Sequence, residues 1–119
     1  MIESILFVED EFFIAAMTER QLKALGIATI VHAANVAEAL DAIERTDFDF
    51  ALLDVNLGEE NSFPIADRLA ERGIAHAFMT GYDASFLEER ARAALLRKPV
   101  RSSELRSILE KQGQRSRAA

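Results

Sequence analysis

The feature that most constrains the fold is a regular alternation between short apolar runs and longer amphipathic runs. Apolar runs of strand length occupy residues 2–8, 28–32, 48–53, 74–79 and 95–98. Each run is followed by a stretch in which apolar residues recur every three or four positions, the spacing of one helical face. Strands that alternate with helices form a parallel sheet with right-handed connections and helices on both faces. We therefore predict an α/β protein.

The length of the chain selects among α/β folds. A chain of 119 residues suits one domain with a sizeable core. At this length a flavodoxin-like (βα)5 arrangement, with a five-stranded parallel sheet of order 2-1-3-4-5, accommodates all the strands and helices. We place this single domain at residues 1–112 and expect residues 113–119, GQRSRAA, to form a frayed tail.

Several residues mark where the helices begin. Asn35 can cap a helix and is followed three positions later by Glu38, as in a capping box. Pro64 suits the first turn of a helix, and Ser102 can cap the last one. A further helix is expected at residues 83–93. In the first helix, the residues expected to pack into the core are Phe12, Phe13, Ile14, Met17, Leu22 and Leu25.

Composition argues against several classes of protein. The net charge of −6 disfavours non-specific binding to nucleic acid or to anionic membranes. No apolar run approaches the ~20 residues of a membrane span, and the first residues lack the basic start of a signal peptide. The absence of cysteine excludes disulfides and thiolate-bound metals. We therefore expect a cytoplasmic protein without a membrane or a direct nucleic-acid partner.

Polar residues with distinct chemistry stand at the ends of the predicted strands. These residues are Glu9 and Asp10 after the first strand, Asp54 after the third, Thr80 at the fourth and Lys98 at the fifth. In an open parallel sheet, ligands bind beyond the carboxyl ends of the strands, near the point where strand order reverses. For the order 2-1-3-4-5 this point lies between the first and third strands. We therefore expect these side chains to converge.

The converging groups suit phosphoryl transfer. Carboxylates with no basic residue among them form an oxygen-rich site that fits Mg²⁺. A carboxylate beside a metal can act as a nucleophile and form an acyl phosphate, and the protein then mainly neutralises charge on the moving phosphoryl group. The roles required are a nucleophile, a metal site, a fixed cation and a hydroxyl donor. They are filled by Asp54, by Glu9 with Asp10, by Lys98 and by Thr80 respectively.

Four short motifs stand at these strand ends. They are FVEDE after the first strand, LLDVNLG after the third, MTGY after the fourth and RKP after the fifth. Each motif alone is weak. Together, and in this order, they resemble the receiver domain of two-component response regulators over residues 2–112. The resemblance implies a stand-alone, chemotaxis-regulator-like signalling protein.

The resemblance implies a role for each site residue. Asp54 is expected to accept the phosphoryl group, Lys98 to pair with it, and Thr80 to act as the switch hydroxyl. The expected Mg²⁺ ligands are Asp10, Asp54, the backbone carbonyl of Asn56 and, more loosely, Glu9. The protein is then not an enzyme with a separate substrate. It catalyses only its own phosphorylation and autodephosphorylation.

Two positions depart from the family pattern. Leu95 stands where receivers commonly carry a tyrosine or phenylalanine that acts as a rotameric switch, and Val100 replaces a common phenylalanine. The stretch FMTGYD is similar to an alphaproteobacterial subgroup with a Phe-Ala-Thr-Gly-hydrophobic-Tyr motif, which also lacks the aromatic. The switch candidates are therefore Thr80, Tyr82 and Leu95. Pro99 occupies a position prone to a cis peptide bond.

The resemblance also implies protein partners. A sensor histidine kinase or a phosphotransfer protein would donate the phosphoryl group, and a downstream protein target would respond to it. The usual output surface of the family combines the fourth helix, the fifth strand and the fifth helix. Here this surface carries Glu88, Glu89, Arg92, Arg97, Arg101 and Arg106. Such a mixture of charges suits contact with another protein.

Two other functions stay open from the sequence alone. A receiver-like module could bind partners regardless of phosphate, because the aromatic switch is missing at Leu95. A haloacid-dehalogenase-type phosphatase also uses an aspartate nucleophile with Mg²⁺. Its motif belongs on the first strand, however, and its second acid would fall at position 56, which is Asn56 here. His32 and His76 are interpreted as strand residues rather than ligands, because two isolated histidines form no metal site.

Overall fold

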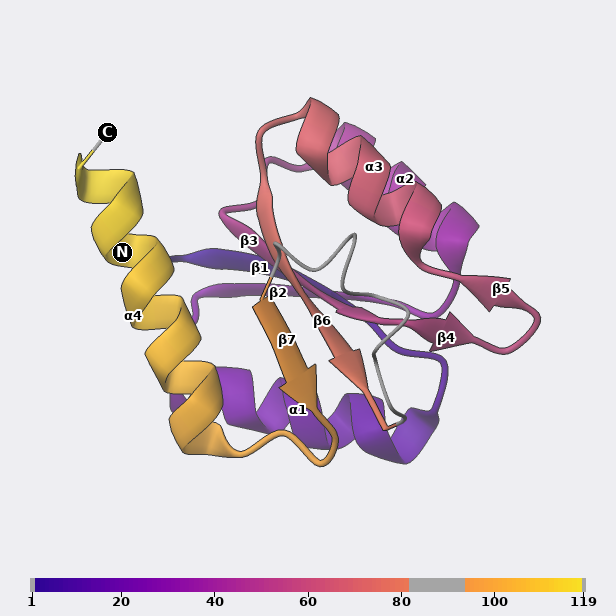
Figure 1. The fold of residues 1–119 in the computed structure, drawn as a ribbon, viewed down its shortest axis with the longest axis horizontal. Coiled ribbons are helices and arrows are strands. Elements are labelled where there is room, and N and C mark those ends of the chain that lie inside the picture. The colour runs from indigo at the N-terminus through magenta and orange to yellow at the C-terminus, as the bar shows by residue number, and fades with distance from the viewer. Residues whose placement is uncertain (1, 82–93, 119) are drawn as a thin grey trace.

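A five-stranded parallel sheet forms the centre of the protein (Figure 1). The computed structural model describes residues 2–81 and 94–118. Its sheet consists of β1 (Ser4–Val8), β2 (Thr29–Ala33), β3 (Phe50–Asp54), β6 (Ala75–Thr80) and β7 (Ala94–Arg97). These strands lie in the order β2-β1-β3-β6-β7, all parallel, which confirms the predicted flavodoxin-like order.

The helices cover both faces of this sheet. They are α1 (Phe12–Ala24), α2 (Val36–Arg45), α3 (Phe63–Glu71) and α4 (Ser102–Ala118). Helices α2 and α3 pack on one face and α1 and α4 on the other (Figure 1). Because alternate strand residues point to opposite faces, Leu6 and Val8 of β1 join the α2–α3 core, while Ile5 and Phe7 join the α1–α4 core.

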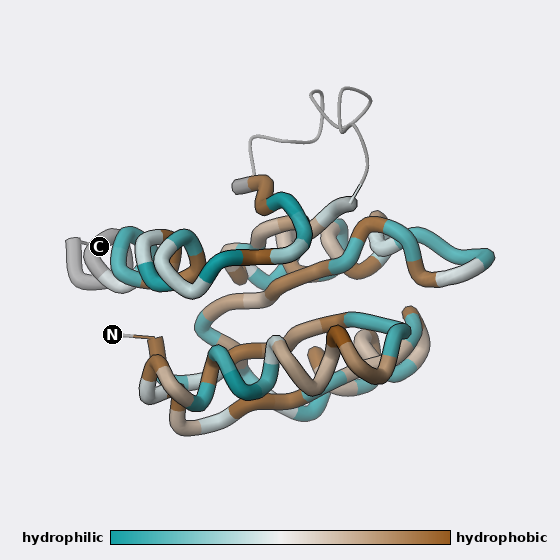
Figure 2. Tube along the Cα trace, turned by 90° about the horizontal axis from the view of Figure 1, so that it is seen from below, coloured by the Kyte–Doolittle hydropathy of each residue, from teal (hydrophilic) through white to brown (hydrophobic). Residues whose placement is uncertain are grey.

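Polar and apolar residues alternate along the helices in the way that this layered arrangement requires. Figure 2 shows helical turns that change between teal and brown, as expected where one side faces the sheet and the other faces solvent. Strand β3, by contrast, is buried at every position. A parallel strand covered on both faces needs such a continuous apolar run. Asp54, the last residue of this buried strand, is therefore held in a fixed place.

The start of α2 confirms the predicted capping box. The Asn35 side-chain oxygen accepts a hydrogen bond from the Glu38 N–H at 2.9 Å, and the Asn35 amide donates to the Glu38 carboxylate at 2.9 Å. Pro64 lies in the first turn of α3, also as predicted. Ser102 is the first residue of α4 rather than the residue before it.

The predicted core face of α1 is partly wrong. Phe12 and Phe13 are each 79% exposed and Met17 is 57% exposed, whereas the residues that α1 buries are Ala15, Thr18 and Leu22. These three positions follow helical spacing, but two of them are small or polar. The side of α1 that faces the sheet therefore carries Ala15, Thr18 and Leu22, and the two phenylalanine rings face solvent.

The backbone of α4 is helical as far as Ala118, which differs from the frayed tail predicted for residues 113–119. Gln, Arg and Ala are good helix formers, so the segment can extend the helix in spite of the ~1 kcal/mol cost of a glycine within it. The predicted helix at residues 83–93 and Tyr82 lie outside the described residues. Across residues 2–81 and 94–118, none of the helices has the length and apolar character needed to traverse a bilayer.

A small antiparallel hairpin after β3 was not predicted. Strands β4 (Asn56–Leu57) and β5 (Glu60–Asn61) pair with each other and leave a two-residue loop at Gly58 and Glu59. Gly58 has a φ of +70°, a conformation that glycine adopts without strain and that tight hairpin loops require. The hairpin projects beside the carboxyl end of β3 (Figure 1), so it forms one wall of the region next to Asp54.

Candidate functional site

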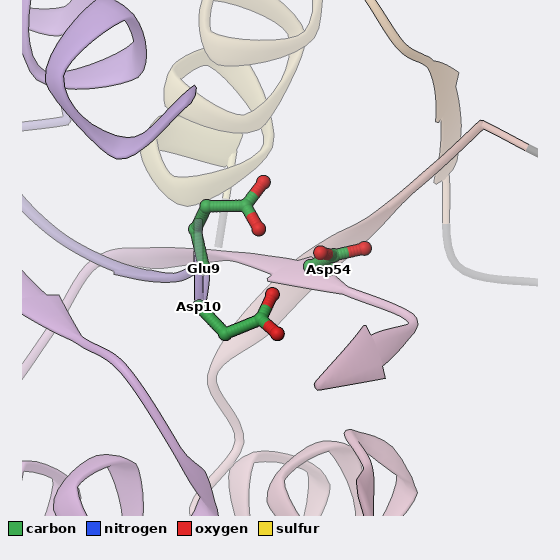
Figure 3. A group of neighbouring side chains, drawn as sticks. All are labelled: Glu9, Asp10 and Asp54. Carbon is green, nitrogen blue, oxygen red and sulfur yellow. The ribbon is translucent and has the colours of Figure 1, made fainter. Parts of the chain in front are cut away.

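Three carboxylates meet where the two central strands end. Glu9 and Asp10 follow β1, and Asp54 is the last residue of β3, which pairs directly with β1. One oxygen of each carboxylate lies within 4.8 Å of the other two. Figure 3 shows the three side chains turned toward the same space. Glu9 is fully buried and Asp54 is 6% exposed, while Asp10 faces solvent.

Lys98 reaches this cluster from the far side of β6. It follows the last residue of β7, and its backbone N–H donates to the Thr80 carbonyl at 2.8 Å, which extends the pairing of β6 with β7. Its Nζ donates to Glu9 Oε1 at 2.5 Å and to Asp54 Oδ2 at 2.8 Å. The Lys98–Pro99 peptide bond is cis, in the position where a cis bond was predicted.

Burial and charge act in opposite directions on this cluster. Burial is the main cause that raises the pKa of the Glu9 carboxyl; a hydrogen bond with Asp54 adds to the increase, and Lys98 opposes it. Burial would lower the pKa of the Lys98 ammonium, but the hydrogen bonds to Asp54 and Glu9 raise it above its usual value. Lys98 therefore stays charged, while Glu9 sits in an environment that disfavours its negative charge.

A polar cleft of about 640 Å³ opens over the carboxylates. Its lining residues are Asp10, Glu11, Ile14, Asp54, Asn56, Gly58, Gly81 and Lys98. A Cβ at Gly58 would stand 3.8 Å from Asp10 Oδ2, so the hairpin runs close to this carboxylate. A small polar ligand can therefore reach Asp54 and Lys98 from solvent, whereas Glu9 lies beneath the floor of the cleft and is not among its lining residues.

Two of the switch candidates, Thr80 and Leu95, lie within the described residues. Thr80 ends β6 and is 1% exposed; it is not among the described residues that line the cleft. Leu95, on β7, stands opposite Phe78 of β6 and is 39% exposed. Of the predicted output surface, Arg97, Arg101 and Arg106 are exposed, and the remaining members lie outside the described residues.

Two contacts around the site were not predicted. The Gln21 side chain of α1 donates from Nε2 to the Val100 carbonyl at 2.8 Å, which ties α1 to the loop that follows Lys98. The His32 ring of β2 lies 2.7 Å from the Glu9 carbonyl oxygen. His32 is a strand residue, as predicted. Its position beside Glu9 depends on the register of β1 with β2, in which Phe7 stands opposite His32.

The fold and the cluster of acids at the strand ends agree with a family assignment from the whole sequence. The family described as the response regulator receiver domain matches residues 5–110, and the chain belongs to this family. Membership favours a signalling phosphoacceptor over the haloacid-dehalogenase-type phosphatase considered above. Among curated proteins, no sequence matches the chain with statistical significance.

Several solved structures are similar to this chain in both sequence and fold. The solution structure of SdrG from Sphingomonas melonis Fr1 is 37% identical, with a TM-score of 0.81 over 93% of this chain and 96% of that one. The solution structure of SdrG from Pseudomonas melonis Fr1 in its BeF3-activated conformation has 38% sequence identity to this chain. Its TM-score is 0.79, over 92% of this chain and 94% of that one. A CheY-like receiver domain protein from Methanospirillum hungatei JF-1 is 27% identical and has a TM-score of 0.85 over 100% of each chain.

Proposed function

We propose that this protein is a phosphoacceptor that switches protein contacts in two-component signalling, with Asp54 as the residue that carries the phosphoryl group. The observation that carries the proposal is the position of Asp54. Its carboxylate is anchored at the end of a buried strand, lines an open cleft, and accepts a hydrogen bond from Lys98 at 2.8 Å. The likeness to SdrG, which has a BeF3-activated conformation, supports the same function.

The donor set fits a divalent cation. Three carboxylates and one ammonium leave an excess of two negative charges (−3 + 1 = −2) among Glu9, Asp10, Asp54 and Lys98. The candidate metal-ligand atoms are carboxylate oxygens, which Mg²⁺ prefers. Asp10, Asp54, the Asn56 carbonyl and, less directly, Glu9 would hold the ion. When bound, Mg²⁺ would neutralise charge on the phosphoryl oxygens.

The chemistry of the chain's own residues is then a single displacement. An Asp54 carboxylate oxygen forms a bond to phosphorus, the bond from phosphorus to the donor's histidine nitrogen breaks, and its electron pair returns to the imidazole. Lys98 Nζ already donates to Asp54 Oδ2, so it stands ready to donate to an oxygen of the incoming group. Attack by water on phosphorus later restores the Asp54 carboxylate and releases inorganic phosphate.

The conformational change that follows phosphorylation of Asp54 would begin at Thr80. This threonine ends the strand beside β3, and its carbonyl accepts the Lys98 N–H. A movement of the Thr80 side chain toward a phosphoryl group on Asp54 would shift the neighbouring strand β7. On β7, Leu95 presents an exposed apolar side chain in place of an aromatic ring. Tyr82, two residues after Thr80, is the further candidate for this role.

Exposed apolar side chains next to the cleft support a protein as phosphoryl donor. Phe12 and Phe13 contact each other edge to face, with ring centroids 5.7 Å apart, at the start of α1. Met17 lies on the same helix and lines an apolar groove of about 290 Å³ that also contacts Lys98. Exposed aromatic residues of this kind are typical centres of protein–protein contact. A histidine kinase or phosphotransfer protein would cover them as its phosphohistidine enters the cleft.

The test is phosphorylation of the purified chain with acetyl phosphate and Mg²⁺, followed by intact mass and peptide mapping. Wild type should gain one phosphoryl group, and Asp54→Asn should gain none. Asp41→Asn, an exposed aspartate on α2, is the matched control and should behave as wild type. A wild type without an adduct, or an adduct that persists in Asp54→Asn, would overturn the proposal.

A second candidate is a module that binds its partner regardless of phosphate. The observation that favours it is Leu95, which replaces the aromatic switch and is only partly buried. The two functions differ in a binding measurement. A phosphorylation switch predicts that beryllofluoride, an analogue of the phosphoryl group, changes the affinity for the downstream partner, whereas the second function predicts equal affinity with and without it.

A further inference from the structure

Both backbone polar groups of Glu9, the N–H and the carbonyl, contact residues of β2. Its N–H donates to the Ala33 carbonyl at 3.0 Å, which continues the pairing of β1 with β2 one residue past the strand. Its carbonyl oxygen lies 2.7 Å from Nε2 of His32. Since a carbonyl can only accept, Nε2 carries the proton, and the His32 side chain supplies the donor that the strand ladder no longer provides.

The His32 ring makes a second contact that supports this orientation. It stacks on Phe7, with ring centroids 4.7 Å apart and an angle of 13° between the planes. Phe7 is 1% exposed and stands directly opposite His32 in the strand register. His32 is itself an exposed residue of β2, so the orientation of its ring depends on this stack and on the hydrogen bond to the Glu9 carbonyl.

The peptide that accepts this hydrogen bond joins two carboxylates with opposite environments. Glu9 is fully buried beside Lys98, and the next residue, Asp10, faces the open cleft. The orientation of their shared peptide plane sets the direction in which each side chain leaves the backbone. We propose that His32 is a positioning residue for the Glu9–Asp10 pair, holding through the Glu9 carbonyl the arrangement that binds a divalent cation. The inference rests on the proposed Mg²⁺ site.

Two substitutions separate the donor from the ring. His32→Phe keeps a flat ring against Phe7 and removes the N–H, whereas His32→Gln keeps an N–H at a similar reach and removes the ring. His76→Phe is the matched control, because His76 lies near the amino end of β6, away from the site. Mg²⁺ affinity is measured by calorimetry and by the shift of the Asp10 amide resonance during titration. The free energy of unfolding is measured separately for each variant.

We expect His32→Phe to bind Mg²⁺ about tenfold more weakly, the lower end of what the loss of a supporting contact to a metal ligand produces. His32→Gln should recover most of the affinity, and His76→Phe should bind as wild type. Equal affinity in His32→Phe and wild type, or equal losses in the Phe and Gln variants, would overturn the inference. If neither variant folds, ¹⁵N NMR of wild type decides, because an Nδ1–H tautomer at His32 would also overturn it. No Mg²⁺ binding by wild type would overturn the proposed function as well.

Discussion

The Lys98 ammonium bridges Asp54 and Glu9, two carboxylates that come from adjacent central strands. Its distances to Asp54 Oδ2 and Glu9 Oε1 are 2.8 and 2.5 Å, and its side chain is only 17% exposed. One cation thus offsets charge on a nucleophile candidate that lines the cleft and on a fully buried carboxylate beneath it. This bridge links the stability of the fold to the chemistry of the site.

Replacement of Lys98 should affect both properties. In Lys98→Met we expect acetyl phosphate to modify Asp54 about 100-fold more slowly, because one donor to the phosphoryl oxygens is lost. The free energy of unfolding should fall by about 3 kcal/mol, because Glu9 and Asp54 lose their partner. Mass spectrometry over time and urea denaturation measure the two effects. Lys23→Met, which removes an exposed pair with Glu19, should change stability by less than ~0.5 kcal/mol.

The exposed pair on α1 gives a prediction that separates docking from chemistry. Phe12→Ala and Phe13→Ala should slow phosphoryl transfer from a cognate kinase or phosphotransfer protein by about tenfold or more, the effect of losing an aromatic contact residue. The rate with acetyl phosphate should not change, because a small donor needs no docking surface. Both rings are 79% exposed, so the free energy of unfolding should stay within about 0.5 kcal/mol of wild type. Equal slowing with both donors would argue against a docking role.

His76 should make stability depend on pH. Burial lowers the pKa of this imidazole, and the Ile74 carbonyl and Asp67 oppose the effect only in part. The unfolded chain therefore takes up a proton near the ordinary value of ~6.5, while the native chain takes it up only at lower pH. The contribution of His76 to the free energy of unfolding should be fully present above ~6.5, decrease as pH falls toward the native pKa, and then level. Denaturation of wild type and His76→Phe across this interval should show a smaller decrease in the variant.

The α2 cap predicts a local effect on stability. Asn35→Ala removes the acceptor of the Glu38 N–H and should cost about 1 kcal/mol of unfolding free energy. Asn35→Asp keeps an acceptor oxygen at the same position and should lose only a few tenths of a kcal/mol. Thermal or urea denaturation measures both. A loss of equal size in both variants would show that the contact between the Asn35 amide and the Glu38 carboxylate matters more than the cap.

The convergence of the carboxylates could be predicted from the sequence because it depends only on topology. Once the strands are parallel and ordered 2-1-3-4-5, residues that follow the first and third strands must meet at one edge of the sheet. The apolar runs define the strands, and the charged residues that end them define the place. Glu9, Asp10 and Asp54 therefore lie together as predicted, and Lys98 reaches them from β7.

The orientation of α1 could not be predicted in the same way. This helix has more apolar residues than the sheet can cover, so several stripes of similar hydrophobicity compete. Its contact with the sheet is decided by how closely the backbone can approach, and Ala15 and Thr18 allow a closer approach than a phenylalanine would. The β4–β5 hairpin was missed for a related reason, because strands of two residues show no periodicity.

The position of the charges within the sheet has a consequence for local unfolding. Strands β1 and β3 are hydrogen bonded on both sides, whereas β7 pairs only with β6 within the described part of the chain. Central strands usually open only with the whole domain, while edge strands exchange their amide protons through smaller fluctuations. In hydrogen-exchange measurements the backbone amides of β1 and β3, the strands that position Glu9, Asp10 and Asp54, should therefore stay protected while those of β7 exchange. Detachment of this one edge would withdraw Lys98 and leave the acids in place, so the site can lose its cation without losing the fold.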